Sequence, residues 1–289
     1  MSYLKQFFST YGKDLENNQI LPLSNGQHAI WLEQQLYPND TSNHFHFVAK
    51  IHEKLNLQAL QEAIRQLVDR HESLRTIFPV SHGLPIRQLL PTSDIDLQVN
   101  NCTDLSEDAI KLQIQKNLEK PFDLSVELPC KFILYQQSES EYYFQIVAHH
   151  IAISLHGYVR LPAEIAKLYI SKRDGKEAKL PGQFGSYSAF VKNQYERSQC
   201  DGCEADKDYW KHYLSGSLPK PILPTEPHTP SSSLIIKKTY CCDLDNNLVA
   251  KLKEIGLFHD AHFFSRNDRG FSSFAIAIYE TGRNYPGYS

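Results

Sequence analysis

Hydrophobic residues recur at helical spacing most clearly in the segment 55–78. The periodic positions are Leu57, Leu60, Ile64, Leu67, His71 and Leu74. Asn56 stands just before them, and its side chain can accept a hydrogen bond from a free backbone N–H of the first turn. The segment is therefore predicted to be an amphipathic helix that begins after Asn56.

Alternating apolar and polar positions predict strands elsewhere in the first part of the chain. They are the segment 44–52, a hairpin over 76–90 and two stretches on either side of a polar turn within 119–150. Further helices are predicted from the Ser24–Asn25 cap to Pro38, and over 104–119 and 158–171. The resulting order, β-α-β-β-α-β-β-α, implies an α+β sandwich in which helices flank a mostly antiparallel sheet.

Polar segments alternate with shorter predicted elements after residue 171. Residues 172–185 are polar and contain glycine, and residues 218–233 are rich in proline, so both are predicted to be connecting segments. Helices are expected at 186–199, 205–214 and 246–255, and a strand at 234–244.

The composition narrows the class of protein and its partners. A chain of 289 residues, 41% hydrophobic and 22% charged, is an ordinary globular protein of one large domain or two small ones. Its net charge of −3 provides no basic surplus for nucleic acid, and no apolar run is long enough to span a membrane. The N-terminus lacks a signal-peptide pattern, so a cytoplasmic location with neither nucleic acid nor membrane as a partner is expected.

The cysteines do not have the spacing of a zinc site. Cys200 and Cys203 form a C-x-x-C, but Cys241 and Cys242 are adjacent in a strand-like stretch and would point to opposite faces. Free thiols and no bound metal are therefore expected.

Two adjacent histidines, His149 and His150, end an alternating run and precede a predicted helix. In strand geometry one ring faces the core and the other faces away, so a buried, structural pair is one interpretation. Histidine is also the usual residue for proton transfer near neutral pH, and a strand end can project a side chain into a cleft. The pair by itself leaves both interpretations open.

Four separate segments, in order along the chain, carry a family resemblance. They are "LSNGQHAIWLEQQLYP" (23–38), "DRHESLRTIF" (69–78), "HHIAIS" (149–154), and "SYSAFVKNQ" (186–194) followed by "DYWKHYLSGSLPKPILPT" (208–225). In these segments, and in "EKPFDLS" (119–125), the chain resembles the condensation domains of nonribosomal peptide synthetases. The third segment stands where that family has the motif HHxxxDG. The resemblance extends over about residues 20–255.

The resemblance implies a fold of two chloramphenicol-acetyltransferase-like lobes with the active site between them. The first lobe is expected at 1–179, and 180–289 is expected to be an incomplete second lobe with an irregular tail. The implied reaction joins an upstream acyl or peptidyl thioester to the amine of a downstream aminoacyl thioester. Both substrates are carried on phosphopantetheine arms, and no bound cofactor or metal is implied. The implied partners are carrier-protein domains and a downstream adenylation domain.

The resemblance also assigns roles to particular residues. By its place in the motif, His150 is the catalytic candidate, and His149 is its supporting, inward-facing neighbour. Arg70 and Arg75 match arginines of the second motif, which in the family are thought to hold the histidine loop through its aspartate.

Three further residues are expected at the substrate tunnel. Gln27 and Trp31 match the first motif, and Gly157 follows the third.

The third motif departs from the family at two positions. Ser154 stands in place of the aspartate, which removes a charge-assisted pair with a motif arginine, and Leu155 stands in place of the glycine. A glycine there would tolerate a positive φ, a freedom that Gly157 could supply instead. These departures motivate two alternatives: a catalytically degenerate module that docks carrier proteins or acts as a scaffold, and a free-standing acyltransferase that uses coenzyme A.

Overall fold

The computed structural model describes six stretches of the chain. They are residues 3–11, 20–91, 95–182, 185–198, 202–217 and 245–258. Backbone contacts divide the chain into two compact units, Met1–Lys207 and Asp208–Ser289. The predicted lobe boundary at 179/180 remains a prediction. No helix among the described residues is both long and apolar enough to cross a membrane.

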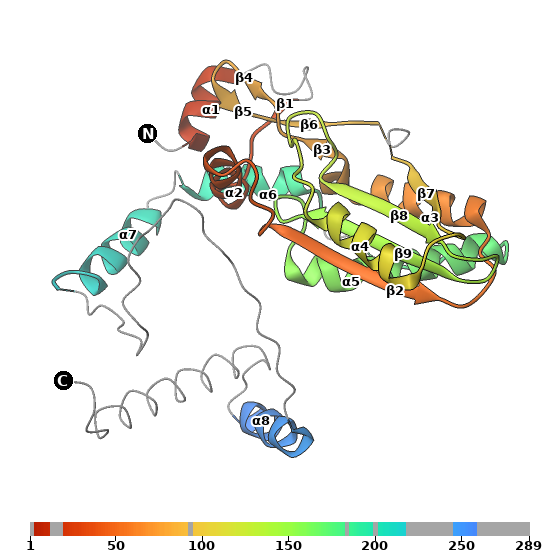
Figure 1. Ribbon diagram of the computed structural model, residues 1–289. Coiled ribbons are helices and arrows are strands. Elements are labelled where there is room, and N and C mark those ends of the chain that lie inside the picture. Colours follow the sequence, from red (N-terminus) through yellow and green to blue (C-terminus); the bar gives the residue numbers. More distant parts are fainter. Residues whose placement is uncertain are drawn as a thin grey trace, which may run out of the picture. The chain divides into compact units, whose positions relative to one another are not determined.

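A four-stranded sheet is the centre of the first unit (Figure 1). In spatial order its strands are β2 (His44–Ile51), β9 (Tyr142–His149), β8 (Cys130–Gln136) and β7 (Leu97–Asn101). The first three pair antiparallel, and β7 runs parallel to β8. The mostly antiparallel sheet of the prediction is confirmed. Strand β7 was not predicted, because it is a polar edge strand whose Val99 is largely exposed.

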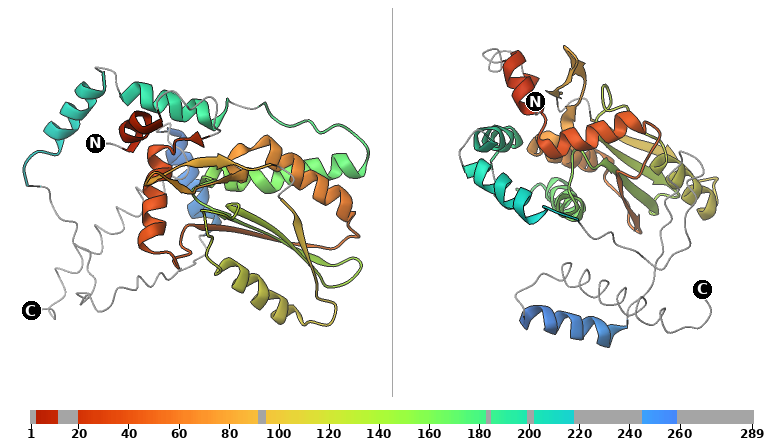
Figure 2. Two further views of the ribbon diagram at one scale, coloured as in Figure 1. Left: turned by 90° about the horizontal axis from the view of Figure 1, so that it is seen from above. Right: turned by 90° about the vertical axis from the view of Figure 1, so that its left-hand side faces the viewer.

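Helices cover both faces of this sheet (Figures 1 and 2). On one face lie α3 (Leu57–Arg70) and α5 (Leu155–Arg173), and on the other lies α4 (Glu107–Leu118). The apolar stripe of α3 packs against α5 and the strands, as its periodicity predicts. The core of this face includes Leu60, Ile64, Leu67, Phe132, Leu134, Ile146, Ile165 and Leu168.

A second layer of short elements packs at the end of the sheet where β9 finishes. It contains α1 (Tyr3–Tyr11), α2 (Asn25–Leu36), α6 (Tyr187–Ser198), and the short strands β1 (Ile20–Leu21), β3 (Thr76–Ile77), β4 (Val80–Ser81), β5 (Leu84–Pro85) and β6 (Arg87–Leu89). The predicted hairpin is present as β4–β5, with β3 pairing to β6 outside it. A separate cluster that includes Leu4, Phe7, Leu23, Phe78 and Val191 holds these elements together.

Several predicted boundaries are wrong by a few residues. Helix α3 ends at Arg70 rather than continuing to 78, and a 3-10 turn, η2 (Glu72–Arg75), follows it. Helix α5 begins at Leu155 rather than 158, because Ser154 caps it. Helix α4 begins at Glu107 rather than 104, after its own cap, Ser106.

The predicted helices toward the end of the chain are confirmed. They correspond to α6, α7 (Gly202–Tyr213) and α8 (Asn246–Phe258). Helix α1 was not predicted. The predicted connection 218–233 and strand 234–244 lie outside the described residues, as do Cys200, Cys241 and Cys242.

Candidate functional site

The histidine pair lies where strand β9 ends and the chain turns toward α5. In the β2–β9 ladder His149 stands opposite His44, and the next backbone N–H, that of His150, donates to the Asn43 carbonyl at 2.8 Å. The alternation of a strand then places His149 in the interior, with no exposed surface, while His150 is exposed. The two rings therefore occupy different environments and can do different things.

His149 is held as a neutral imidazole. Its Nδ1 accepts the backbone N–H of Ile151 at 3.1 Å, and its Nε2 donates to Oε1 of Gln34 at 3.2 Å. The pKa of His149 is lowered to about 3, mainly by burial and to a smaller extent by the neighbouring His44 and His150. A ring with both nitrogens occupied and so low a pKa does not exchange protons near neutral pH. It fixes the turn that carries His150.

His150 has the opposite character. Its Nδ1 lies 2.9 Å from the carbonyl oxygen of Ile153, and because a carbonyl only accepts, Nδ1 must be the protonated nitrogen. This tautomer leaves the lone pair on Nε2. His150 also lines a cavity of about 990 Å³. The structure thus presents a histidine with an acceptor nitrogen at the edge of a space large enough for a ligand.

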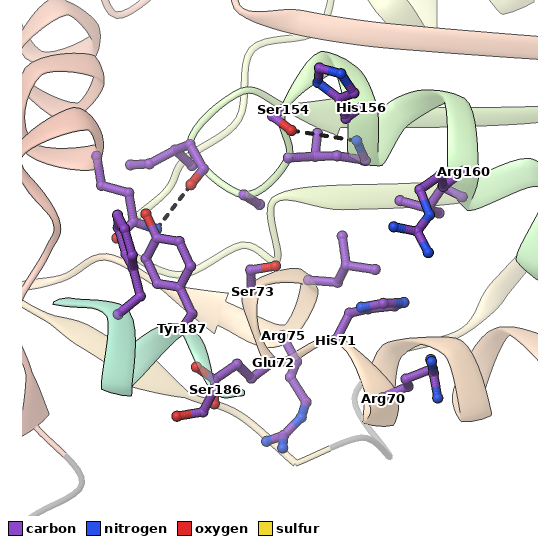
Figure 3. Close-up of a pocket in the computed structure, with 18 of the residues that line it drawn as sticks. Arg70, His71, Glu72, Ser73, Arg75, Ser154, His156, Arg160, Ser186 and Tyr187 are labelled. Carbon is purple, nitrogen blue, oxygen red and sulfur yellow. Dashed lines mark hydrogen bonds between the residues drawn. The ribbon is translucent and has the colours of Figure 1, made fainter. Parts of the chain in front are cut away.

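The cavity is formed by segments that are far apart in the sequence (Figure 3). Its walls come from the start of α2, the end of α3 with η2, the turn 150–154, the first half of α5 and the start of α6. Polar and charged lining residues include Arg70, His71, Glu72, Ser73, Arg75, His156, Arg160, Glu164 and Ser186. All these segments belong to the first unit.

The two motif arginines have partners on other elements. Nε of Arg70 lies 3.6 Å from Oε2 of the buried Glu164 on α5, and its Nη2 donates to the Pro181 carbonyl. Nη1 of Arg75 donates to the Leu90 carbonyl at 3.1 Å, and the side chain points away from Ser154 (Figure 3). In the expected arrangement an arginine holds an acidic residue at position 154. Here Arg70 pairs with Glu164 and Arg75 bonds to the Leu90 carbonyl instead.

Ser154 has a structural role at the start of α5. Its backbone is extended, and its Oγ accepts the N–H of Gly157 at 3.4 Å (Figure 3). Leu155 is the first helical residue, and His82 is the one non-glycine with positive φ among the described residues. Position 155 therefore has a helical conformation that leucine adopts readily, and Gly157, which also lies in α5, does not supply a positive φ in its place.

Gln27 connects α2 to the turn of the histidine pair. It forms a capping box with Ser24, and its Nε2 donates to the Ile151 carbonyl at 3.0 Å. It is 4% exposed and also lines the cavity. Gln27 therefore holds the turn at Ile151, while the Asn43 carbonyl holds it at His150.

The two other expected tunnel residues lie in different surroundings. Gly157 lines the cavity, and a Cβ at this position would lie 2.8 Å from Cγ1 of Ile153, so the close approach requires glycine. Trp31 is not among the cavity residues; it is half-buried and stacks on His28 with ring centroids 6.3 Å apart.

Two residues that the sequence analysis did not select also shape the site. Oε2 of Glu164 lies 2.7 Å from Nε2 of His71, which joins α5 to the end of α3. The Tyr187 hydroxyl shares a hydrogen bond of 2.8 Å with Ser24, which joins α6 to α2. An acid within the apolar stripe of α5 was a usable signal for Glu164. Tyr187 lies inside the fourth motif segment.

No metal site is present in the part of the chain that the structure describes. Among those residues, no three His, Cys, Asp or Glu side chains are grouped so that they could hold an ion. The lining of the cavity instead offers an imidazole acceptor, arginines and hydroxyls, which suit proton transfer and recognition of a polar ligand.

Comparisons of the sequence with protein families and with known proteins point to the same family. The model of the condensation domain family matches residues 17–280. CymA of Salinispora arenicola, described as a probable non-canonical nonribosomal peptide synthetase, is 26% identical over 257 residues, which cover 85% of this chain and 3% of CymA.

Two solved structures illustrate the same fold. The first condensation domain of the calcium-dependent antibiotic synthetase, in complex with a substrate analogue, matches with a TM-score of 0.67 and 19% identity, over 85% of this chain and 58% of that one. The X-domain in complex with OxyB from teicoplanin biosynthesis matches with a TM-score of 0.64 and 21% identity, over 74% and 47%. This chain therefore spans about half of these solved chains and a small part of CymA.

Proposed function

Because this chain belongs to the condensation domain family, we propose that it provides the catalytic turn for amide formation between two carrier-bound groups. The donor is an acyl or peptidyl thioester, and the acceptor is the amine of an aminoacyl thioester. The observation that carries the proposal is the bonding of His150. Its Nδ1 donates to the Ile153 carbonyl, which leaves the lone pair on Nε2, and the residue lines the cavity.

The residues of this turn fit the chemistry of aminolysis. The amine nitrogen attacks the thioester carbonyl, a C–N bond forms, the C–S bond breaks, and the released thiolate takes up a proton. Nε2 of His150 accepts the proton that the attacking nitrogen loses, or hydrogen-bonds to the tetrahedral intermediate. The neutral His149 and the bond from Gln27 to Ile151 hold the turn while this happens.

The substrates arrive on phosphopantetheine arms, so the partners in this proposal are carrier-protein domains, with an adenylation domain further along the assembly line. The chain needs no bound cofactor for this chemistry. The cavity draws on residues from both predicted lobes, 1–179 and 180–289, since Ser186, Tyr187 and Phe190 line it beside the histidine turn. The expected place of the active site between two lobes stays a prediction, because all of these residues belong to one compact unit.

Replacing His150 tests the proposal. In the synthetase that contains this chain, His150→Ala is expected to slow amide formation between two loaded carrier proteins at least about 100-fold, because general base catalysis contributes that much. The product is measured by mass spectrometry of the acceptor carrier. His52→Ala is the matched control, because His52 is an exposed histidine at the end of β2, outside the cavity lining. Equal rates for His150→Ala and the unchanged protein would exclude His150 from the mechanism.

A second candidate is a module that binds carrier proteins without catalysis. Ser154 in place of the motif aspartate, with Arg75 turned to the Leu90 carbonyl, favours it. The same fold occurs in the X-domain that forms a complex with OxyB. If the unchanged protein gives no amide product in that assay but binds the carrier proteins in a separate binding measurement, this candidate is favoured.

A further inference from the structure

Two aromatic rings lie directly behind His150. The ring of Phe45, on β2, has its centroid 5.1 Å from that of the His150 imidazole at an interplanar angle of 74°. The ring of Tyr158, in α5, stacks on Phe45 with centroids 5.3 Å apart and an interplanar angle of 25°. The Tyr158 hydroxyl donates to the His46 carbonyl at 2.5 Å, so this ring is attached to β2 at its far end. The result is a continuous row of three rings that joins β2, α5 and the histidine turn.

This row restricts the ring of an exposed side chain. His150 is exposed and follows the end of β9, so its side chain could otherwise rotate about two torsion angles. The bond from Nδ1 to the Ile153 carbonyl fixes one edge of the imidazole, and the edge-to-face contact with Phe45 fixes its plane. Phe45 and Tyr158 are themselves half-buried and are not among the cavity residues. They therefore do not line the cavity themselves, and Phe45 reaches it by its ring contact with His150.

We infer that Phe45 and Tyr158 are positioning residues, which hold the His150 imidazole in the single orientation that keeps Nδ1–H on Ile153 and leaves Nε2 as the acceptor. This inference rests on the proposed function of His150 for its catalytic consequence, but the orientation is a property of the chain alone. A base that leaves its productive geometry by even 1 Å loses much of its rate advantage.

The orientation is measured without substrate. In the full chain with ¹⁵N-labelled histidine, the ring nitrogen shifts report whether His150 is a single Nδ1–H tautomer. The unchanged protein is expected to show that tautomer, and Phe45→Leu is expected to show a mixture with averaged shifts. Phe47→Leu is the matched control, because Phe47 lies on the same face of β2 and packs against the same core cluster. If Phe45→Leu keeps the single tautomer, or if Phe47→Leu loses it equally, the inference is wrong.

A milder pair of variants decides the question if Phe45→Leu does not fold. Tyr158→Phe keeps the stack but removes the bond to His46, whereas Tyr169→Phe removes a hydroxyl of the same helix, which accepts the N–H of Asn56 at 3.1 Å. Tautomer mixing in Tyr158→Phe but not in Tyr169→Phe supports the inference, and identical spectra contradict it.

Kinetics distinguish the positioning of the His150 ring from its proposed catalytic role. In the synthetase, Phe45→Leu is expected to lower kcat about tenfold with KM for the loaded carriers unchanged, because the residue acts on the base and not on binding. If the tautomer changes as expected but His150→Ala leaves amide formation intact, the proposed function fails and the positioning of the ring stands.

Discussion

At the scale of single residues, the two adjacent histidines differ in burial. His149 is a buried structural group, and His150 is an exposed hydrogen-bond acceptor. His149 faces the side of the sheet where His44 also lies, with ring centroids 5.7 Å apart. Burial lowers the pKa of both rings, while the bond from His44 to the Leu118 carbonyl opposes the shift there. Both rings are therefore neutral in the folded chain at neutral pH, and protonating either of them destabilises the folded state.

Stability is therefore expected to fall on acidification. The pKa of His149 is about 3 in the folded chain and about 6.5 when unfolded, so the unfolded chain binds more protons between these values. The stabilisation is complete above pH 6.5 and is lost as pH falls, by up to about 1.4 kcal/mol per pH unit for this residue. Urea unfolding between pH 7.5 and 5 measures the slope.

The variant His149→Gln removes this titrating ring and should make the slope shallower, although it lowers the stability at pH 7.5; the part that remains belongs to other buried histidines such as His44. His52→Gln, which changes an exposed histidine, should leave the slope as it is. Parallel slopes for His149→Gln and the unchanged protein would show that another group causes the acid sensitivity.

At the scale of elements, the start of α5 explains how the chain tolerates the loss of the motif aspartate. Serine and aspartate are both good N-cap residues, because either side chain can accept a free N–H of the first turn. Ser154 keeps this function through Gly157 and gives up only the charge. The helix therefore begins at the same place whichever of the two residues is present, and the turn of His150 is retained.

Substitutions at Ser154 should separate capping from charge. Ser154→Ala is expected to lower the free energy of unfolding by about 1 kcal/mol, whereas Ser154→Asp should preserve it or raise it slightly through the helix dipole. Thermal or urea unfolding measures the differences. Ser106→Ala, which removes the equivalent cap of α4, should cost a similar amount. A loss in Ser106→Ala with none in Ser154→Ala would mean that the α5 cap contributes nothing.

At the scale of the first unit, one ion pair connects α6 to the rest of the structure. Arg87, which is 1% exposed, places Nη2 at 3.3 Å from Oε1 of Glu72, and the ring of Tyr187 lies 4.9 Å from its guanidinium carbon. The same Glu72 oxygen accepts the backbone N–H of Ser188 at 3.1 Å. Burial lowers the pKa of Arg87, and Glu72 is the foremost group opposing that shift. The motif glutamate therefore joins η2, β6 and the helix that closes one wall of the cavity.

Removing this carboxylate should be far more costly than removing an exposed one. Glu72→Ala leaves the Arg87 charge buried without its ion-pair partner, and the expected loss is about 3 kcal/mol of unfolding free energy. Asp96→Ala breaks the exposed pair with Arg65 and should cost less than about 1 kcal/mol. Urea unfolding of both variants compares them, and similar small losses would show that Glu72 does not anchor α6.

The sequence by itself determined the elements whose cause is local. Helix α3, strands β8 and β9 and the caps Ser24 and Asn56 follow from periodicity and from the chemistry of the first turn, which act over a few residues. The motif segments pointed to the turn of His149 and His150 and to the family of the fold. Edge strand β7 was missed because an edge strand buries little and so lacks a clear alternation.

Only the tertiary structure decided which side chains meet. Arg70 and His71 share Glu164 across 93 or more residues of sequence, and Glu72 reaches Ser188 across 116. The alternation of a strand separates two neighbouring histidines but does not say which face is buried. For His149 the contacts with Gln34 on α2 and with the ring of Phe122 decide it. The tautomer and orientation of His150 depend in the same way on a carbonyl and on rings that only the folded chain brings beside it.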